Sequence, residues 1–503
     1  MTDPFIILPV LLHLLTAILL IFCWKKVRAQ KIISVAGNLV IVLLAFGLWM
    51  KVWNLGILTM QGGGWEAPFG ITFAADTLSA TLMLLTGIAG LAVAIYSCAG
   101  ITKNRIQFGY FPIVHFLLMG LNGAFLAGDI FNLYVWFEVI IISSFVLMTL
   151  GGRKPQLEGA INYVTMNLLA SVIFLTAIGI LYGLTGSLNM ADLSIKIADI
   201  ENRELVHVTA ILFFVGFGIK SAVFPLYFWL PSSYNTPPSA IAAIFGGLLT
   251  KVGIYALMRV FTLIYIPDSF LKGVFLFVAG ATLVTGALGA LGKTDIRRLL
   301  SYLIICHIGY MLAGLALYTE QAMTGALFYL FHDIVIKTNL FLIAGLIYKI
   351  AGTYKMSELG GIYRRYPKLS LVMAAVFFSL VGIPPLSGFW PKLYLISESL
   401  NSGSYILLAS ILIASFITMY VIAKLWAEVF WKEPMVVTDL KAAGFDALSN
   451  FKKQLLVIPV IALTALTLYM GFGAQHIAVL AERISTELFH HQPYIDAVFE
   501  PKN

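Results

Sequence analysis

Long apolar runs without charged residues recur along most of the chain. The first covers residues 4–24, and further runs of 18 or more residues follow at short intervals. Each run is long enough to cross a hydrocarbon core of about 30 Å as a helix, which satisfies its own backbone hydrogen bonds. The first run lacks a small-residue cleavage site, so we interpret it as a retained helix. The sequence therefore predicts an all-α integral membrane protein.

Composition agrees with this class and excludes several others. Hydrophobic residues make up 60% of the 503 residues and charged residues 11%, where a soluble domain has about a quarter charged residues. The net charge of +8 comes without a basic patch interleaved with aromatics, so we expect no nucleic-acid partner. Cys23, Cys98 and Cys306 lie far apart and offer no metal, iron–sulfur or disulfide spacing. We expect no cofactor and no bound metal.

The runs predict about fourteen transmembrane helices. We place them near residues 4–24, 32–50, 77–99, 110–128, 130–151, 159–183, 206–231, 238–260, 269–291, 299–318, 322–348, 369–397, 404–430 and 454–475. The segment 476–503 is amphipathic, and we expect it along the outer surface or against a partner. Four units follow from this reading: helices 1–3 in residues 1–109, five-helix units in 110–260 and 261–430, and the last helix with its tail in 431–503.

The loops between these helices carry basic residues unevenly. With Arg259 counted at the outer end of its span, 20 lysines and arginines fall on one side of the membrane and 7 on the other, out of 32. The positive-inside rule places the richer side in the cytoplasm and both termini outside. With a wrong number of helices, the basic residues would be distributed more evenly between the two sides, so the uneven distribution supports the predicted number.

Ionisable residues inside the predicted spans are the candidate functional groups. A charge at the membrane centre costs at least about 2.5–3.5 kcal/mol, so such residues usually face a protein interior and serve a function. The candidates are Glu138, Lys220, Lys251, His307, His332, Asp333, Lys337, Lys392 and Lys424. Glu138 lies about nine residues inside its span, roughly 13 Å deep at 1.5 Å per residue.

Prolines next to two of the lysines predict broken helices. Pro225 follows Lys220 in GIKSAVFPLYFWLP, and Pro384 precedes Lys392 in GIPPLSGFWPKLY. Proline inside a span frees backbone carbonyls, which is tolerated only next to protein or a hydrated cavity. The two segments lie five spans apart, so the second five-helix unit would be an inverted repeat of the first. In this register Lys220 corresponds to Lys392, and Lys251 corresponds to Lys424.

These residue types suit proton movement. A buried lysine holds its proton while a carboxylate lies near it, and it releases the proton more readily when the carboxylate is distant. Glu138 is the candidate partner of Lys220. Histidine changes charge near neutral pH and suits an intermediate station. The spans show no cluster of oxygen ligands typical of a sodium site, which favours protons on this chain.

Several stretches resemble a known family. FNLYVWFEVIIISSF, KSAVFPLYFWLPSSYNTPPSAIAAIFGGLLTKVGIYALMR, FHDIVIKTNLFLIAG and PPLSGFWPKLYLI are similar to the antiporter-like subunits shared by respiratory complex I and Mrp-type antiporters. The resemblance covers roughly residues 60–430. It implies that Glu138 is the fifth-helix glutamate, Lys220 the seventh-helix lysine and Lys251 the bridging eighth-helix lysine. It further implies that Lys392 is the terminal lysine of the twelfth helix, and that His332 and Lys337 belong to a broken eleventh helix.

The details favour the Mrp branch of this family. Ser143 and Ser144 stand where complex I subunits often carry proline, and Tyr227 and Tyr234 stand where they often carry histidine. The chain most resembles the D subunits of Mrp-type Na⁺/H⁺ antiporters. This resemblance implies a secondary transporter subunit rather than an enzyme, in a bacterial cell membrane. It also implies partner membrane subunits in a hetero-oligomeric complex, with H⁺ and Na⁺ as the transported ions.

Other interpretations stay open at this point. The same fold serves as a proton-pumping arm of redox complexes, or the chain is a scaffold without transport. Asp333 and Lys337, four residues apart, would also suit a simple intrahelical ion pair. Lys424 would also suit an interfacial position, His307 a buried core position, and Asp76 a helix start.

Overall fold

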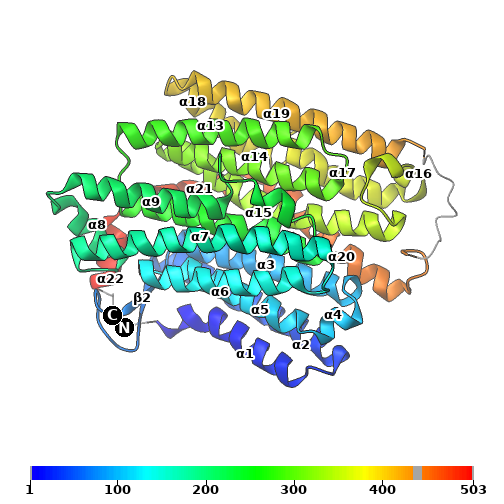
Figure 1. The fold of residues 1–503 in the computed structure, drawn as a ribbon, viewed down its shortest axis with the longest axis horizontal. Helices are drawn as coiled ribbons and strands as arrows, with labels where there is room; N and C mark the ends of the chain where they lie inside the picture. The colour runs from blue at the N-terminus through cyan, green and yellow to red at the C-terminus, as the bar shows by residue number, and fades with distance from the viewer. Residues whose placement is uncertain (1–2, 434–443, 501–503) are drawn as a thin grey trace.

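The computed structural model describes residues 3–433 and 444–500, which form a bundle of long, roughly aligned helices (Figure 1). Twelve helices in these residues are long and apolar enough to cross a membrane. They are η1–α1 (Pro4–Phe22), α2 (Val27–Leu55), α3 (Thr77–Gly100), α6 (Ile130–Thr149), α7 (Lys154–Thr185), α9 (Arg203–Ser221), α11–η2–α12 (Ser239–Leu263), α13 (Ser269–Leu291), α14 (Ile296–Leu317), α15 (Glu320–Ala351), α19–η4 (Tyr405–Trp431) and α20 (Asn450–Phe472). Two shorter apolar helices are α5 (Tyr110–Leu126) and α17 (Pro367–Val381). The all-α membrane class is confirmed, whereas the count of fourteen spans and the inverted repeats remain predictions.

Short elements complete the chain. They are α4 (Lys103–Gln107), α8 (Met190–Asp199), α10 (Trp229–Ser233), η3 (Met356–Glu358), α16 (Ile362–Arg365), α18 (Phe389–Asn401), α21 (Ala474–Phe489), α22 (Gln492–Phe499) and the antiparallel strands β1 (Leu58–Gly62) and β2 (Ile71–Ala75). The small hairpin is an addition to the expected all-helical fold. Its turn begins at the glycine run after Gln61, where Gly63 and Gly64 adopt positive φ angles.

Polar side chains fix where many helices begin. The Asp76 carboxylate accepts a hydrogen bond from the Ser79 backbone N–H at 2.8 Å and caps α3, which confirms the helix-start interpretation. Asp129 caps α6 in the same way through the Asn132 N–H. Such caps satisfy backbone donors that the first helical turn leaves without partners.

Both expected helix breaks are present. The helix α9 ends at Ser221, and six irregular residues after Ala222 lead to α10. The helix α17 ends at Val381, where Gly382 adopts a left-handed φ of 89°, and α18 begins at Phe389. Prolines in these connections cannot continue the backbone hydrogen-bond ladder.

The expectation of a broken eleventh helix is wrong. The helix α15 runs without interruption from Glu320 to Ala351 and carries His332 and Lys337 in its middle. This segment contains no proline, so each backbone N–H can still donate to the carbonyl four residues earlier.

The proposed register between the two breaks is also wrong in detail. Lys220 lies in α9, before its break, whereas Lys392 lies in α18, after its break. Lys251 is fully buried in α12, whereas Lys424 is only partly buried in α19. Lys220 and Lys392 therefore do not occupy equivalent positions, and the correspondence of Lys251 with Lys424 stays a prediction.

The C-terminal segment packs against this chain's own helices, not only along its surface. The helix α21 lies against α15 and contacts α3, α12 and α20. Ser485 donates to the Glu320 carbonyl at 2.8 Å, and Thr77 donates to the Glu487 carboxylate at 2.7 Å. Small residues on the buried face of α21, Ala478 and Ala481, allow this close approach.

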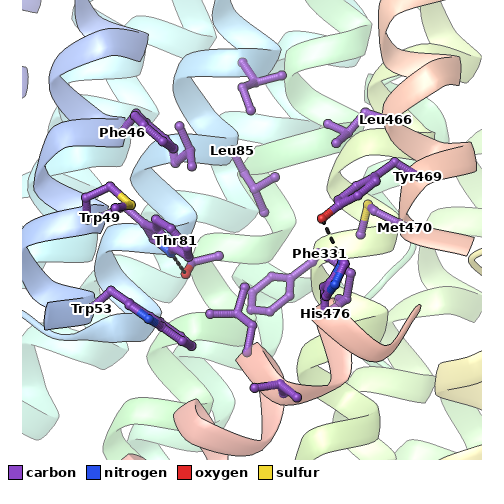
Figure 2. Close-up of a pocket in the computed structure, with 16 residues that line it drawn as sticks. Phe46, Trp49, Trp53, Thr81, Leu85, Phe331, Leu466, Tyr469, Met470 and His476 are labelled. Carbon is purple, nitrogen blue, oxygen red and sulfur yellow. Dashed lines mark hydrogen bonds between the residues drawn. The ribbon is translucent and has the colours of Figure 1, made fainter. Parts of the chain in front are cut away.

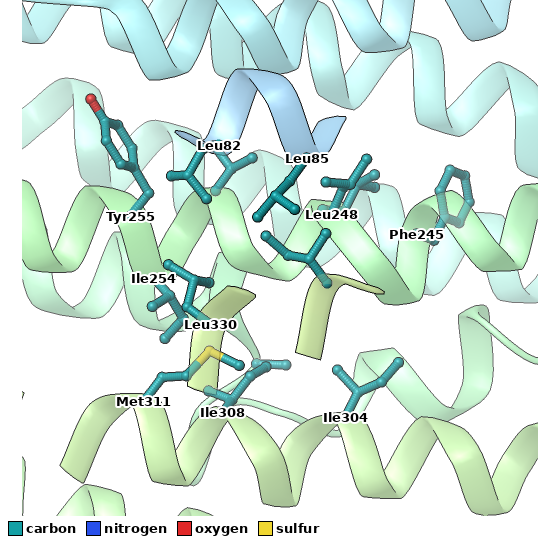
Figure 3. Packing of buried hydrophobic residues seen from close by; sticks show 14 of the residues in the cluster. Leu82, Leu85, Phe245, Leu248, Ile254, Tyr255, Ile304, Ile308, Met311 and Leu330 are labelled. Carbon is teal, nitrogen blue, oxygen red and sulfur yellow. The ribbon is translucent and has the colours of Figure 1, made fainter. Parts of the chain in front are cut away.

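The centre of the bundle is a dense apolar core. Figure 3 shows Leu82 of α3, Leu248 of the π-helical turn η2, Ile308 of α14 and Leu330 of α15 packed together. Cores of this kind are close-packed, so the buried charged residues lie in an interior where screening is weak.

A separate apolar cavity of about 550 Å³ lies between α2, α3, α15, α20 and α21. Figure 2 shows Trp49 and Thr81 on one side, hydrogen-bonded at 3.1 Å, and Tyr469 with His476 on the other, also at 3.1 Å. None of the lysine, aspartate or glutamate candidates lines it.

Candidate functional site

The first part of the site surrounds Lys220 in the last turn of α9. Its side chain is buried, with Nζ donating to the Ser171 hydroxyl at 3.3 Å and lying 4.7 Å from the centre of the Phe137 ring. A cavity of about 10 Å³, room for about one water, lies beside it. Tyr163 and Tyr234 help to line this cavity. Within the part of the chain that the structure describes, the ammonium group therefore has a hydroxyl and an aromatic ring beside it but no direct carboxylate partner.

Glu138 lies one residue after Phe137 on α6 and is half-buried. Its Oε1 atom is buried and has no hydrogen-bond partner among the described residues. Within the same residues, no ion pair joins Glu138 to Lys220.

The second part of the site is a cluster of four ionisable groups, Asp333 and three basic residues around it. One carboxylate oxygen of Asp333 lies 2.7 Å from Lys251 Nζ of α12. The other lies 3.0 Å from His307 Nδ1 of α14 and 4.0 Å from Lys337 Nζ, one turn along α15. All four side chains have no exposed surface. We refer to these residues as the Asp333 cluster.

A π-helical turn positions Lys251. The turn η2 spans Phe245–Leu249, and the Gly246 carbonyl that it presents accepts a hydrogen bond from Lys251 Nζ at 2.6 Å. A wider helical turn leaves carbonyls off the usual ladder, and such turns recur at functional sites. Leu249 of the same turn lines the cavity beside Lys220. The turn therefore separates Lys220 from the Asp333 cluster.

The third part of the site lies at the break before α18. Lys392 Nζ donates to the Val381 carbonyl at 2.7 Å, one of the carbonyls that the end of α17 leaves free. His332 Nδ1 lies 2.8 Å from the Ser387 hydroxyl in the same break. The break thus holds Lys392 through a free backbone carbonyl and His332 through a side-chain hydroxyl.

Two tyrosines connect the third part of the site to the Asp333 cluster. Lys392 Nζ lies 5.1 Å from the centre of the Tyr310 ring, which stacks on Tyr329 at 4.7 Å. His307 contacts both rings, and His332 contacts Tyr329. We call the whole series, from Lys220 through the Asp333 cluster to Lys392 and His332, the buried axis.

An additional buried ion pair lies outside this axis. Arg259, which the loop count placed among the outer basic residues, is buried in α12 and pairs with Asp76. The Tyr494 ring of α22 covers it at 5.3 Å. The sequence placed Arg259 at the outer end of the span near 238–260, whereas α12 continues beyond it to Leu263.

Sequence reasoning named the lysines of the axis but did not assign His307 or Asp333 a role. A simple ion pair between Asp333 and Lys337 is not the arrangement found, because Asp333 lies closer to Lys251 and His307. The available signal was an acidic residue in the middle of a long apolar helix. Among the described residues, no group of three or more His, Cys, Asp or Glu side chains is placed to hold a metal ion.

Known proteins match this chain over much or all of its length. The family model described as NADH:quinone oxidoreductase/Mrp antiporter, TM, matches residues 127–418. The D subunit of the Na(+)/H(+) antiporter of Alkalihalophilus pseudofirmus is 39% identical over 99% of this chain and 100% of its own length. The protein of the same name from Bacillus subtilis is also 39% identical, over 99% of this chain and 100% of its own.

Solved structures agree. A chain in the structure of the Mrp complex from Dietzia sp. DQ12-45-1b has a TM-score of 0.90 and 29% identity, covering 98% of this chain and 99% of that one. A chain of respiratory complex I from Thermus thermophilus has a TM-score of 0.79 at 23% identity, over 96% of this chain and 100% of that one. The latter similarity shows the fold alone.

The helical bundle and its line of buried ionisable groups define an antiporter-like membrane protein. This chain belongs to the transmembrane family of NADH:quinone oxidoreductase and Mrp antiporter subunits, and its full-length relatives are named as the D subunits of Na⁺/H⁺ antiporters.

Proposed function

We propose that this chain is the proton-translocating subunit of a multisubunit Na⁺/H⁺ antiporter in a bacterial cell membrane. One observation carries the proposal: Lys220, Lys251, Lys337 and Lys392 are at most 5% exposed and follow one another through the bundle. A protein that only filled space would be destabilised by four such groups, because each costs several kcal/mol to remove from water without a full set of partners.

The buried axis moves protons by changing which group is protonated. A proton arriving near Glu138 and Lys220 changes the charge beside the small cavity. The next stations are Lys251 and the Asp333 cluster, and then Lys392 and His332 at the second helix break. Each step alters the electrostatic cost of charge at the next, because screening is weak in this interior.

The axis suits protons rather than Na⁺. Its lysines outnumber its carboxylates, and a lysine ammonium repels a metal cation, which needs several oxygen ligands. We therefore assign H⁺ to this chain and propose that its partner subunits help to carry Na⁺. The working unit is a hetero-oligomeric membrane complex that couples the two fluxes, and the chain acts as a transporter subunit rather than an enzyme.

The orientation in the membrane follows from charge. We propose that the end bearing α4 and α16, with the basic residues Lys103, Arg105, Arg364 and Arg365, faces the cytoplasm. Both chain termini then lie on the outer side.

The test measures Na⁺-driven pH changes in membrane vesicles that contain the whole complex. Lys220→Met and Lys251→Met keep the apolar stem and remove the titrating group, so each is expected to lower antiport about 100-fold, the scale of a lost proton-transfer group. Lys424→Met is the matched control, because this lysine also lies in a span but is only partly buried and outside the axis.

Assembly is checked by immunoblotting of the intact complex after native electrophoresis. Wild-type antiport in the assembled Lys220→Met and Lys251→Met complexes would refute the proposal. Equal loss in the Lys424→Met complex would show that any lysine change in a span disturbs transport, and would remove the support for a defined axis.

A further inference from the structure

The Asp333 cluster has fewer negative groups than positive ones. Lys251 and Lys337 both approach the same carboxylate, at 2.7 Å and 4.0 Å, and His307 lies at 3.0 Å. Among the described residues, these are the ion pairs that Asp333 makes, and no second carboxylate joins them. In an interior with weak screening, one carboxylate can compensate one full ammonium charge but not two.

The two lysines are held differently. Lys251 Nζ has both the carboxylate and the Gly246 carbonyl as partners. Lys337 Nζ is fully buried and makes no hydrogen bond among the described residues. In the structure the Asp333 carboxylate therefore pairs directly with Lys251. Lys337 lies near the same carboxylate without a hydrogen bond to it.

The geometry permits the opposite assignment. Lys337 follows Asp333 by four residues, so the two side chains lie on the same face of α15. Lys251 reaches the carboxylate from α12, a different helix. Rotation of the Asp333 side chain, without any movement of helices, shortens its distance to one lysine as it lengthens its distance to the other.

We propose that Asp333 is a counter-ion shared by Lys251 and Lys337, an inference that rests on the proposed function. Its carboxylate moves between the two lysines, and this movement couples deprotonation of one lysine to protonation of the other. Asp333 is a positioning residue: it stays ionised and carries no proton itself. The proton passes between the lysine amines, directly or through His307, which already contacts the carboxylate. The Asp333 side chain thus links the part of the buried axis that contains Lys220 and Lys251 to the part that contains Lys337 and Lys392.

The neighbouring charged and titratable groups are consistent with this role. The groups close enough to interact electrostatically with Asp333 are Lys251 from α12, His307 and Cys306 from α14, and Tyr329, His332 and Lys337 from α15 itself. Lys392 approaches from α18 on the far side of Tyr310. A static ion pair would need one basic group, whereas the structure gathers two lysines and a histidine around one carboxylate.

The experiment compares the pH profile of antiport in proteoliposomes that contain the whole complex. Asp333→Asn removes the charge, and we expect antiport to fall at least about tenfold at the optimum, the effect of one pKa unit between the lysines. Asp333→Glu keeps a carboxylate on a longer stem, so we expect partial recovery of the rate with a displaced pH optimum. Glu320→Gln, at the outer end of the same helix, is the control and should leave rate and profile unchanged.

A purely structural role predicts a different set of results. The double variant Lys251→Met with Asp333→Asn leaves no unpaired charge in that pair, so it should assemble even where Asp333→Asn alone does not. This double variant also lacks the Lys251 amine, which the proposed function already requires, so it tests assembly only. A wild-type rate in the assembled Asp333→Asn complex, or an unchanged pH profile in Asp333→Glu, would overturn the inference.

The control lysines separate this inference from the proposed function. If Lys220→Met and Lys392→Met abolish antiport while Asp333→Asn retains the wild-type rate and profile, only the shared counter-ion is refuted. If Lys220→Met and Lys392→Met also transport normally, protons do not use this axis and the proposed function itself fails.

Discussion

Lys392 occupies the first turn of α18, where its ammonium binds the Val381 carbonyl left free by the helix break. Lys392→Met preserves the packing of the stem and removes the titrating group. We expect the protein to remain in the membrane and antiport to fall about 100-fold. Fluorescence of a pH-sensitive dye in everted vesicles measures transport, and an immunoblot measures the amount of protein. Near-normal pH gradients would exclude a role for this lysine.

Glu138 and Lys220 supply a second residue-level prediction. They are separated in the structure, yet attraction between them at about 4 Å would reach about 4 kcal/mol at an effective dielectric constant of about 20. Such an interaction is large enough to control whether the lysine holds its proton. We expect the double variant Glu138→Ala with Lys220→Ala to assemble but remain inactive, because a relay needs titratable groups at both positions.

The alternative is a static pair that forms only in another conformation. In that case the double variant leaves no uncompensated charge and regains the activity that each single variant loses. Antiport assays on the single and double variants, with assembly checked for each, distinguish the two accounts. Restored exchange in the double variant would contradict the relay.

The sequence identifies charged residues of this kind but not their partners. Lys220, Lys251, Lys337 and Lys392 stood out because charge inside an apolar span is costly. The contacts of Asp333 could not be predicted, because Lys251 and His307 reach it from helices far away in the sequence. The four-residue spacing within α15 predicted instead the pair of Asp333 with Lys337, whose charged atoms lie 4.0 Å apart.

At the scale of elements, the break between α17 and α18 depends on a close backbone approach. A Cβ atom at Gly388 would clash with the Ser379 carbonyl and come within 3.2 Å of the His332 ring. We expect Gly388→Ala to destabilise the complex by about 1–3 kcal/mol, as overpacking usually does, and to lower antiport. Thermal unfolding of the purified complex in detergent measures the first effect.

Gly273→Ala on α13 is the matched control for this change. A Cβ atom there meets no neighbour within 4 Å, and alanine is the better helix former. We expect no loss of stability or transport. If the Gly388→Ala complex unfolds at the same temperature as wild type and transports normally, the close packing at the break contributes neither to stability nor to antiport.

The helix breaks themselves were predictable, because proline next to a buried lysine is an explicit signal. The π-helical turn η2 was not, since it depends on how Gly246 and Gly247 pack: a Cβ at Gly247 would clash with Thr338 on α15. The unbroken α15 was mispredicted for a related reason. Family resemblance implied a break that this segment has no proline to enforce.

At the scale of the whole molecule, the two ends of the described chain meet at one end of the bundle. Asp3 N–H donates to the Thr59 carbonyl at 3.2 Å, and the Thr59 hydroxyl donates to the Ala497 carbonyl at 2.8 Å. Figure 1 shows α22 and β2 at that end, opposite α4 and α16. The positive-inside rule predicts that this end faces outward.

A protease-sensitive tag fused to the C-terminus tests the orientation. We expect protease added to protoplasts or spheroplasts to remove the tag. In sealed everted vesicles we expect the tag to be protected. Cleavage in everted vesicles alone would place the termini in the cytoplasm and reverse the proposed direction of the axis.

On the proposed function, protons cross the membrane along the buried axis of this chain as part of a larger complex. Lys251 is the most informative position, because it lies between Lys220 and the rest of the axis and is fully buried. The measurement follows H⁺ uptake with a pH dye and Na⁺ efflux with a radioactive tracer in the same proteoliposomes. Liposomes with the purified chain alone serve as a second sample, and we expect no exchange from them.

For the complex carrying Lys251→Met, we expect both fluxes to fall together, by about 100-fold, while the Lys424→Met complex exchanges the two ions like wild type. Wild-type H⁺ and Na⁺ fluxes through the assembled Lys251→Met complex would show that protons do not use the buried axis.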